Sequence, residues 1–342
     1  MAQSGDAEPR GQSHDGYSGR LSGRDESGHP ATPVLPSFFS RRGGDSAGLP
    51  ATVVPSGRWR SIVRPFRSDE LASRLGERDW EIMMTVRSFK YLTTRQICRQ
   101  HFGLAAGNGP IPRHANHALA RLRELGLLTN LDRRIGGVRA GSGGHVWQIT
   151  DLARRLLGEH LNEPASGRIR VFEPSTTFLE HTLAVAEVVI SLQEVTSSTD
   201  ITLAHLQVEP ECWRSYLGPS GETRWLKPDL AVVTEFGNYE DHWFIEVDRA
   251  TEPPNRIIKK CHQYQEYRRS DREQAKIEVF PAVVWVVPNE RRRDQLRGRL
   301  ANEVTNDDQM FTVVTTPDLG ALVVAGATDF KDSKPSRKEG AK

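Results

Sequence analysis

The sequence predicts an α+β protein in which three helices and a β-hairpin are followed by a second segment that mixes strands and helices. Three observations predict this class. Apolar residues recur at helical spacing between residues 71 and 125, two short extended runs then flank a glycine-rich loop, and four strand-like runs with one helix among them follow residue 200. At 342 residues with 37% hydrophobic content, the chain is long enough for two folded domains and tails.

Both ends of the chain have a different composition from the middle. Residues 1–66 and 327–342 are rich in Gly, Ser, Pro and charged residues, and have too few apolar residues to offset the entropy of ordering the backbone. We therefore expect disordered tails there, with folded domains over 67–160 and 173–326 and a polar linker between them.

Three helices are expected in the first folded domain. Apolar residues at helical spacing predict helices from about Asp69, and the pair Thr93–Thr94 provides a threonine cap for a helix that ends near Phe102. The third helix is expected from Pro112 to Leu125, because apolar side chains recur along one face of it: Ala115, Leu119, Leu122 and Leu125.

Two extended runs follow the third helix. Residues 127–129 and 145–149 are expected to pair as strands, and the loop between them is rich in glycine and arginine. Three helices followed by such a hairpin are typical of a winged helix-turn-helix domain, which predicts that residues 67–160 form one.

Positive charge is concentrated in the predicted winged helix. Residues 67–160 contain 15 Lys and Arg against 9 Asp and Glu, whereas residues 161–342 contain 23 against 29. This distribution is expected of a module that binds nucleic acid, here double-stranded DNA. Five candidates for DNA contact lie on the third helix and three in the wing: Arg113, Asn116, His117, Arg121, Arg123, Arg133, Arg134 and Arg139. A protein–protein module is the alternative, and any single arginine could instead belong to a solvated face.

The second domain is expected to have the element order α-β-β-β-α-β. A helix carries apolar residues between Leu183 and Leu192, and strands are expected at 201–208, 229–234, 243–247 and 282–287. A basic helix fits residues 254–269 between the last two strands. This order predicts a mixed sheet with flanking helices.

Carboxylates gather at the ends of two of these strands. Asp229 opens one strand and Glu246 and Asp248 close the next, and a hairpin would bring the acids to the same end of the sheet. Carboxylate oxygens are the ligands that Mg²⁺ prefers, and a bound metal can activate water beside a phosphate. Asp229, Glu246 and Asp248 are therefore candidate metal ligands. The alternative is that they are charged residues at strand ends.

Several motifs in order along the chain resemble those of the replication-relaxation family, which is found in actinobacteria and in their plasmids and integrative elements. The resemblance spans about residues 75–290 and rests on YLTTRQI (91–97), RLRELGLL (121–128), GHVWQITDLA (144–153), HTLAVAE (181–187), KPD (227–229), EVDRATE (246–252) and Lys260 with Tyr264. It implies a role in plasmid replication and DNA relaxation.

The second domain resembles the PD-(D/E)XK nucleases, whose core has the same order of elements. This resemblance implies that Asp229 and Glu246 are the two acids of the motif and that Glu187 is the additional acid of some members. The position of the motif lysine holds Asp248, which reverses the expected charge. Lys260, or alternatively Lys259, could supply the lysine from the following helix, with Tyr264 and Tyr267 on the same side. The other possibility is that catalysis has been lost.

Other sequence features exclude several classes of protein. No apolar run is long enough for a membrane helix or a signal peptide, and three isolated cysteines, Cys98, Cys212 and Cys261, form neither a disulfide framework nor a zinc motif. We therefore expect a cytoplasmic protein without a membrane partner. The sequence has no Walker loop and no GxGxxG, HExxH or GxSxG motif, and it lacks the HxH of relaxases.

Two functions follow as hypotheses. The first is a DNA-binding protein that acts in plasmid or mobile-element replication or relaxation, with replication or mobilisation proteins and a second copy of itself as candidate partners. The second is a Mg²⁺-dependent endonuclease that uses Asp229, Glu246 and Lys260, assisted by Glu187. A transcriptional regulator that senses a ligand in its second domain is a third possibility, because binding pockets need no motif.

Overall fold

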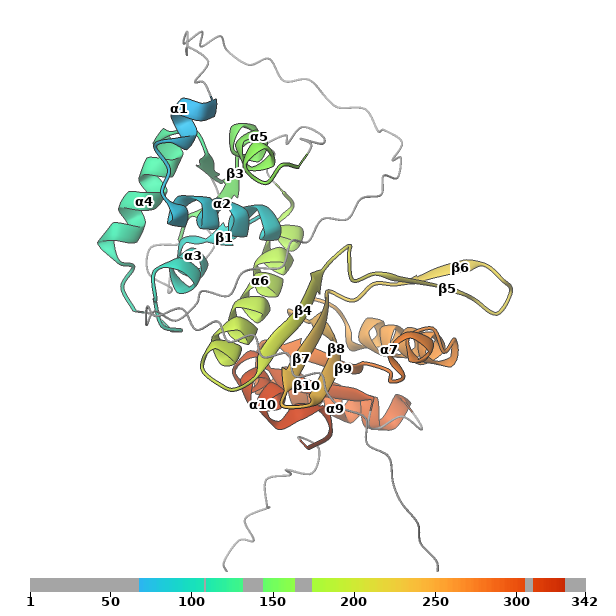
Figure 1. Ribbon diagram of the computed structural model, residues 1–342. Helices are drawn as coiled ribbons and strands as arrows, with labels where there is room; N and C mark the ends of the chain where they lie inside the picture. Colours follow the sequence, from blue (N-terminus) through green and yellow to red (C-terminus); the bar gives the residue numbers. More distant parts are fainter. Residues whose placement is uncertain (1–67, 108, 132–143, 164–173, 305–309, 330–342) are drawn as a thin grey trace, which may run out of the picture. The chain divides into compact units, whose positions relative to one another are not determined.

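A computed structural model describes residues 68–107, 109–131, 144–163, 174–304 and 310–329 (Figure 1). The expected N-terminal tail and the wing residues Arg133, Arg134 and Arg139 lie outside the described residues. Helix α10 ends at Asp329, inside the range assigned to the C-terminal tail, and the rest of that tail also lies outside. Every helix in the described ranges is too short or too polar to cross a lipid bilayer.

Residues 68–160 form five helices and a small sheet. The helices are α1 (Ser68–Ala72), α2 (Glu77–Phe89), α3 (Thr94–His101), α4 (Arg113–Glu124) and α5 (Asp151–His160). The strands β1 (Leu92–Thr93), β2 (Leu128–Asn130) and β3 (Val146–Ile149) form an antiparallel sheet in the order β1-β3-β2. The pairing of β2 with β3 is the expected hairpin, whereas β1 and α5 were not predicted.

Local sequence explains where these helices begin and end. The Thr93 hydroxyl accepts a hydrogen bond from the backbone N–H of Gln96, and the Gln96 side chain accepts one from the Thr93 backbone, so a capping box starts α3. Helix α4 buries Ala115, Leu119 and Leu122 and ends at Glu124. Gly126 follows its C-cap residue, and its φ of 71° suits glycine.

The second segment is built on a five-stranded mixed sheet in the order β10-β9-β8-β7-β4. Strands β4 (Thr202–Val208), β7 (Leu230–Phe236) and β8 (Tyr239–Val247) are antiparallel, and β8, β9 (Ala282–Val287) and β10 (Phe311–Thr315) are parallel. The expected α+β class with a mixed sheet is thus confirmed. The predicted strands correspond to β4, β7, β8 and β9, while β10 was not predicted.

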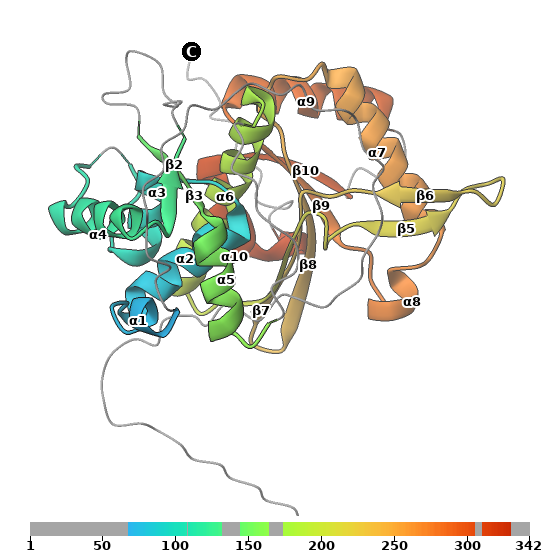
Figure 2. The ribbon, with the colours of Figure 1, turned by 90° about the horizontal axis from the view of Figure 1, so that it is seen from above.

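Helices cover both faces of this sheet (Figure 2). Helices α6 (Thr176–Ser197) and α10 (Leu319–Asp329) pack on one face, and α7 (Pro254–Arg269) and α9 (Glu290–Glu303) on the other. Along β8, Phe244 and Glu246 face α7 while Trp243 and Ile245 face α6, because side chains alternate along a strand. The short helices α8 (Gln274–Ile277) and η1 (Thr316–Asp318) complete the segment.

A separate two-stranded ribbon leaves the sheet between β4 and β7. Strands β5 (Arg214–Leu217) and β6 (Thr223–Leu226) pair only with each other among the described strands. The ribbon lies beside α7, since Gln263 on that helix donates a hydrogen bond to the backbone oxygen of Trp225. This ribbon is an insertion into the predicted order of elements.

Helix α6 also contacts the N-terminal segment. Arg99 on α3 is 5% exposed and forms ion pairs with Glu187 and Glu194 on α6. Gln96, at the start of α3, donates a hydrogen bond to the backbone oxygen of Leu183. Helix α6 is therefore joined to α3 by ion pairs and a hydrogen bond, and it also packs on the mixed sheet.

Candidate functional site

A cluster of charged side chains lies at the sheet end where β7 begins and β8 ends. Asp229 directly precedes β7, and Glu246 is the penultimate residue of β8. The antiparallel register pairs Leu230 with Ile245, so the two acids come to the same end of the sheet. Both are buried, at 8% and 1% exposure.

Asp229 is held by the backbone and by a histidine. Its Oδ2 atom accepts a hydrogen bond from the backbone N–H of Val247 at 2.7 Å, and its Oδ1 atom lies 3.2 Å from Nε2 of His181 on α6. Burial alone would raise the pKa of Asp229, but the His181 hydrogen bond and the charge of Lys260 hold it below its usual range. The same hydrogen bond raises the pKa of His181. His181 thus joins helix α6 to the start of β7 through the Asp229 carboxylate.

Glu246 is held by two side chains of α7. Its Oε1 atom accepts a hydrogen bond from the Tyr264 hydroxyl at 2.6 Å, and its Oε2 atom pairs with Nζ of Lys260 at 2.5 Å. Burial raises the pKa of Glu246 to about 7, even though the Lys260 charge lowers it. Burial lowers the pKa of Lys260, but the charges of Glu246 and Asp229 outweigh burial and raise it. Glu246 therefore titrates near neutral pH beside a charged lysine.

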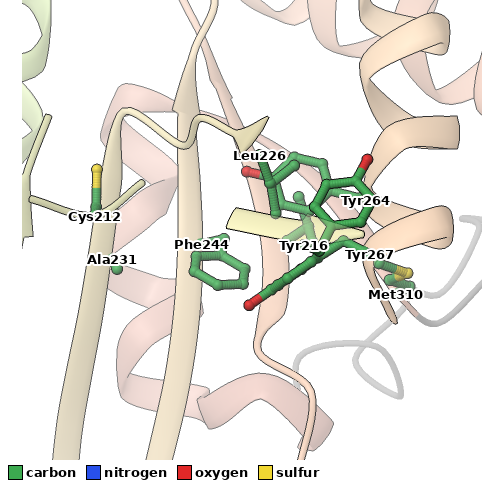
Figure 3. Close-up of a cluster of buried hydrophobic side chains, with 9 residues drawn as sticks. Cys212, Tyr216, Leu226, Ala231, Phe244, Tyr264, Tyr267 and Met310 are labelled. Atoms are coloured by element: carbon green, nitrogen blue, oxygen red, sulfur yellow. The ribbon is translucent and has the colours of Figure 1, made fainter. Parts of the chain in front are cut away.

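Aromatic side chains gather in a buried hydrophobic cluster that includes Phe244 and Tyr264 (Figure 3). Tyr264 is fully buried, and its ring centre lies 5.8 Å from that of Phe244. Tyr216 and Tyr267 belong to the same cluster, with ring centres 5.3 Å apart. This environment excludes water from one side of Glu246, which strengthens its interaction with Lys260.

Two further predicted acids do not join this cluster. Asp248 forms a buried ion pair with Arg292 of α9, in which Nε of Arg292 lies 2.6 Å from Oδ2, and its Oδ1 atom accepts a hydrogen bond from the backbone of Ala250. Glu187 pairs instead with Arg99 on α3. The structure thus brings together Asp229, Glu246 and Lys260 but gives Asp248 and Glu187 other partners.

The donor set bears on whether a metal ion could bind here. In the ranges that the structure describes, no group of three or more His, Cys, Asp or Glu side chains is arranged to hold a metal ion. Mg²⁺ is often bound by only one or two carboxylates, with water and substrate phosphates as its other ligands. Asp229 and Glu246 fit that smaller donor set, because each carboxylate oxygen retains a lone pair beyond its present hydrogen bond.

A cleft opens beside Lys260. It has a volume of about 630 Å³ and lies between the β5–β6 ribbon and α7. Its lining consists of Tyr216, Arg224, Glu252, Arg256, Lys259, Lys260, His262, Gln263 and Glu266. Lys260 therefore connects the buried carboxylates with an open, polar cleft.

The candidate DNA contacts on α4 differ in their surroundings. Arg113, Asn116 and His117 are exposed, and no hydrogen-bond partner is present for their side chains among the described residues. Arg121 is bonded to the Asp79 side chain and to the backbone oxygen of Arg74, which ties α4 to the chain around α2. Arg123 is exposed, with Nη1 lying 3.5 Å from the Asn130 side chain.

Several features of the site were not found from the sequence. The β5–β6 ribbon, which forms one wall of the cleft, has short polar strands that lack a clear alternation of apolar residues. Arg292 was not paired with Asp248, because 44 residues separate them and only the packing of α9 joins them. The basic character of residues 256–262 was the one available signal for the cleft.

Comparison with known proteins adds one firm result. The structure of restriction endonuclease FokI is similar at 9% identity, covering 80% of this chain and 74% of that chain, with a TM-score of 0.23. FokI bound to DNA is similar at 10% identity, covering 64% and 59%, with a TM-score of 0.20. Such low TM-scores carry no argument, and no curated protein matches the sequence. The family model of replication-relaxation proteins matches residues 83–283, which is more than half of the chain, and the protein therefore belongs to the replication-relaxation family.

Proposed function

We propose that this protein binds double-stranded DNA through a winged helix, with α4 as the helix that enters the major groove. The family match supports a role in replication or relaxation. The observation that carries the proposal is the exposed face of α4, where Arg113, Asn116 and His117 project opposite the buried Ala115 and Leu119. A helix that reads DNA needs such a polar face and an apolar face that anchors it in its domain.

Charge outside α4 supports the same proposal. Residues 67–160 contain 15 Lys and Arg against 9 Asp and Glu, so this segment attracts phosphates. The wing arginines Arg133, Arg134 and Arg139 are expected to add phosphate contacts that carry no sequence information. Dimerisation and assembly with other replication or mobilisation proteins remain predictions.

Duplex binding by α4 variants tests the proposal. The full chain with Arg113, Asn116 and His117 all changed to Ala is compared with wild type on a labelled mixed-sequence duplex of roughly 21 base pairs, two helical turns. Arg155→Ala is the matched control, because it removes one exposed cation from α5. We expect the triple variant to bind about tenfold more weakly or worse, with a salt slope reduced by about 0.9 for the lost Arg113 contact. Equal binding by wild type, triple variant and control would overturn the role of α4.

A Mg²⁺-dependent endonuclease is the second candidate function. The observation that favours it is that Lys260 of α7 pairs with Glu246 beside Asp229, the three groups that a PD-(D/E)XK-like site requires. Asp229 and Glu246 would hold the metal ion, which when bound would activate water and stabilise charge on a phosphate. Lys260 would orient the scissile phosphate and offset its developing negative charge.

Nicking of supercoiled plasmid in Mg²⁺ or Mn²⁺ tests this second function. The test protein combines Asp229→Asn with Glu246→Gln, changes that keep the shape of both side chains. Its matched control combines Glu235→Gln with Glu240→Gln. These two residues lie opposite each other in the register of β7 and β8, at the other end of the two strands. Nicking by wild type and the control but not by the test variant would support the endonuclease. Plasmid that is retarded but uncut by all three proteins would leave the DNA-binding function alone.

A further inference from the structure

The cleft between α7 and the β5–β6 ribbon has an excess of positive charge. Four Lys or Arg side chains and two Glu side chains line it, together with His262. The chain around it has the opposite balance, since residues 161–342 contain 23 Lys and Arg against 29 Asp and Glu. The cations are thus concentrated locally in an otherwise acidic segment.

The basic residues of α7 lie near its N-terminus, where the helix dipole disfavours positive charge. Arg256 occupies the first turn of α7, and Lys259 and Lys260 follow in the next. No acidic residue lies in that first turn, although the partial positive charge of a helix N-terminus favours anions. An anion bound in the cleft would compensate this arrangement of charges.

The cations differ in how firmly they are engaged. Lys259 is exposed and has no ion-pair partner among the described residues. Arg256 pairs with Glu252, but the two side chains are 70% and 52% exposed, so water competes strongly for that pair. Arg224 pairs with Glu222 and Glu266 at the cleft wall. Lys259 and Arg256 are therefore the groups most available to a ligand.

We propose that this cleft binds a single DNA strand, whose phosphates contact Lys259 and Arg256 and which leads one phosphate toward Lys260. This inference rests on the proposed DNA-binding function and adds a second contact surface in the other segment of the chain. The volume of about 630 Å³ is in the range of small-molecule pockets and suits a few nucleotides of one strand. A role in replication or relaxation provides separated strands.

The ribbon presents a different surface on its other face. Arg224 and Tyr216 are cross-strand partners that line the cleft, whereas Trp225 pairs with Ser215 on the opposite face and is 50% exposed. The proposal places the strand on the face of Arg224. It therefore predicts that Trp225 contributes little, and Trp225→Ala becomes an internal control.

Anisotropy of a labelled oligothymidylate tests the cleft. An oligonucleotide of about 16 nucleotides is used, at the upper end of the site sizes of single-strand-binding modules. The full chain is measured as wild type and as Lys259→Glu, Arg256→Glu, Lys259→Arg, Trp225→Ala and Lys276→Glu. The last is a matched change on the exposed surface of α8. Each protein is also measured with the triple α4 variant in the background, so that binding by the other segment does not hide the effect.

We expect Lys259→Glu and Arg256→Glu to weaken binding about tenfold and to lower the salt slope by about 0.7 for each lost phosphate contact. Lys276→Glu, Trp225→Ala and Lys259→Arg should bind like wild type. Equal effects of Lys259→Glu and Lys276→Glu would overturn the proposal, as would the absence of oligothymidylate binding by a protein that still binds duplex. In that case the function of α4 would stand, so the two failures are distinguishable.

Discussion

Lys260 of α7 reaches the buried carboxylate of Glu246 at the end of β8, and the two side chains form an ion pair at 2.5 Å. Their exposures differ greatly, at 28% for the lysine and 2% for the glutamate. The lysine side chain therefore keeps partial access to water, while the carboxylate depends on Lys260 and Tyr264. Removing the lysine would leave a nearly isolated charge in the protein interior, which is costly.

The first prediction concerns the loss of this counter-charge. Lys260→Met should lower the free energy of unfolding at pH 8 by about 2 kcal/mol, less than the roughly 3 to 5 kcal/mol of fully buried pairs because Lys260 is partly hydrated. The loss should be smaller at pH 5, where Glu246 can be protonated. Urea denaturation measures both values. Lys259→Met is the control and should change stability by no more than about 0.5 kcal/mol; equal losses in the two variants would contradict the pairing.

The second prediction concerns the pH dependence of stability. Burial raises the pKa of Glu246 from 4.5 to about 7, so the folded protein holds this proton more tightly than the unfolded chain does. The resulting stabilisation is complete below about pH 4.5 and is lost as the pH rises through about 7, in total on the order of 3 kcal/mol. His181 adds to the loss at higher pH, because its pKa is also raised.

Urea midpoints between pH 5 and pH 8 check this prediction. Wild type should lose stability over that range relative to Glu246→Gln, because only wild type has the Glu246 carboxyl group that loses its proton. The variant serves as the reference, since the other titrating groups are present in both proteins. Glu240→Gln, on the exposed end of the same strand, should follow wild type. Parallel curves for wild type and Glu246→Gln would show that burial does not perturb this carboxylate.

The fold was predictable where local pattern and burial coincide. The apolar face of Ala115, Leu119 and Leu122 predicted the helix that the structure gives as α4, because a helix and its buried stripe share one period. Strand β10 was not predicted, since its pairing with β9 depends on a crossover through α9 rather than on a local turn. Strand β9 also pairs through a crossover, but it was predicted because all six of its residues are apolar, whereas β10 includes two threonines.

The candidate site was predictable in part for a related reason. Spacing within one hairpin grouped Asp229 with Glu246, and helical proximity added Lys260. Glu187 was assigned to the same group because it lies on the preceding helix, but its ion pair with Arg99 joins residues 88 positions apart. Residue type and order cannot reveal such a partner, because packing of α3 against α6 decides it.

The third prediction separates two roles for Asp248. Asp248 forms an ion pair with Arg292 in which both side chains are buried, at 4% exposure for Asp248 and 7% for Arg292. Arg292 also donates a hydrogen bond to the backbone oxygen of Glu252. Asp248→Ala should therefore cost about 3 to 5 kcal/mol of unfolding free energy. Asp294→Ala removes a carboxylate that is 65% exposed and should cost less than about 1 kcal/mol.

The same pair of variants tests Asp248 as a metal ligand. If Asp248 serves to anchor α9, the stability difference between wild type and Asp248→Ala should be equal with and without Mg²⁺. A difference that grows on addition of Mg²⁺ would mean that wild type binds the ion through Asp248, since ligands of the folded state stabilise it by mass action. That outcome would restore Asp248 to the set of metal ligands.

The fourth prediction concerns Arg99, which joins α3 to α6. The Arg99 side chain is 5% exposed, whereas those of Glu187 and Glu194 are 37% and 35% exposed. Water can therefore hydrate both carboxylates when the arginine is removed. Arg99→Met should therefore lower the unfolding free energy by about 1 to 3 kcal/mol, below the cost of breaking a fully buried pair. Amide hydrogen exchange should accelerate in α3 and in the part of α6 that it contacts, and should be unchanged in β7 and β8.

A double-mutant cycle isolates the interaction of Arg99 with Glu187. Arg99→Met, Glu187→Gln and the double variant are unfolded in urea, and residues in direct contact typically show a coupling energy of about 0.5 to 3 kcal/mol. Glu180→Gln replaces Glu187→Gln in a control cycle, because Glu180 lies on the same helix but pairs with Arg249. Additive losses in the Arg99–Glu187 cycle would show that the two side chains do not interact in solution. A coupling in that cycle alone would establish that Arg99 links α3 to α6, the helix whose His181 is hydrogen-bonded to Asp229.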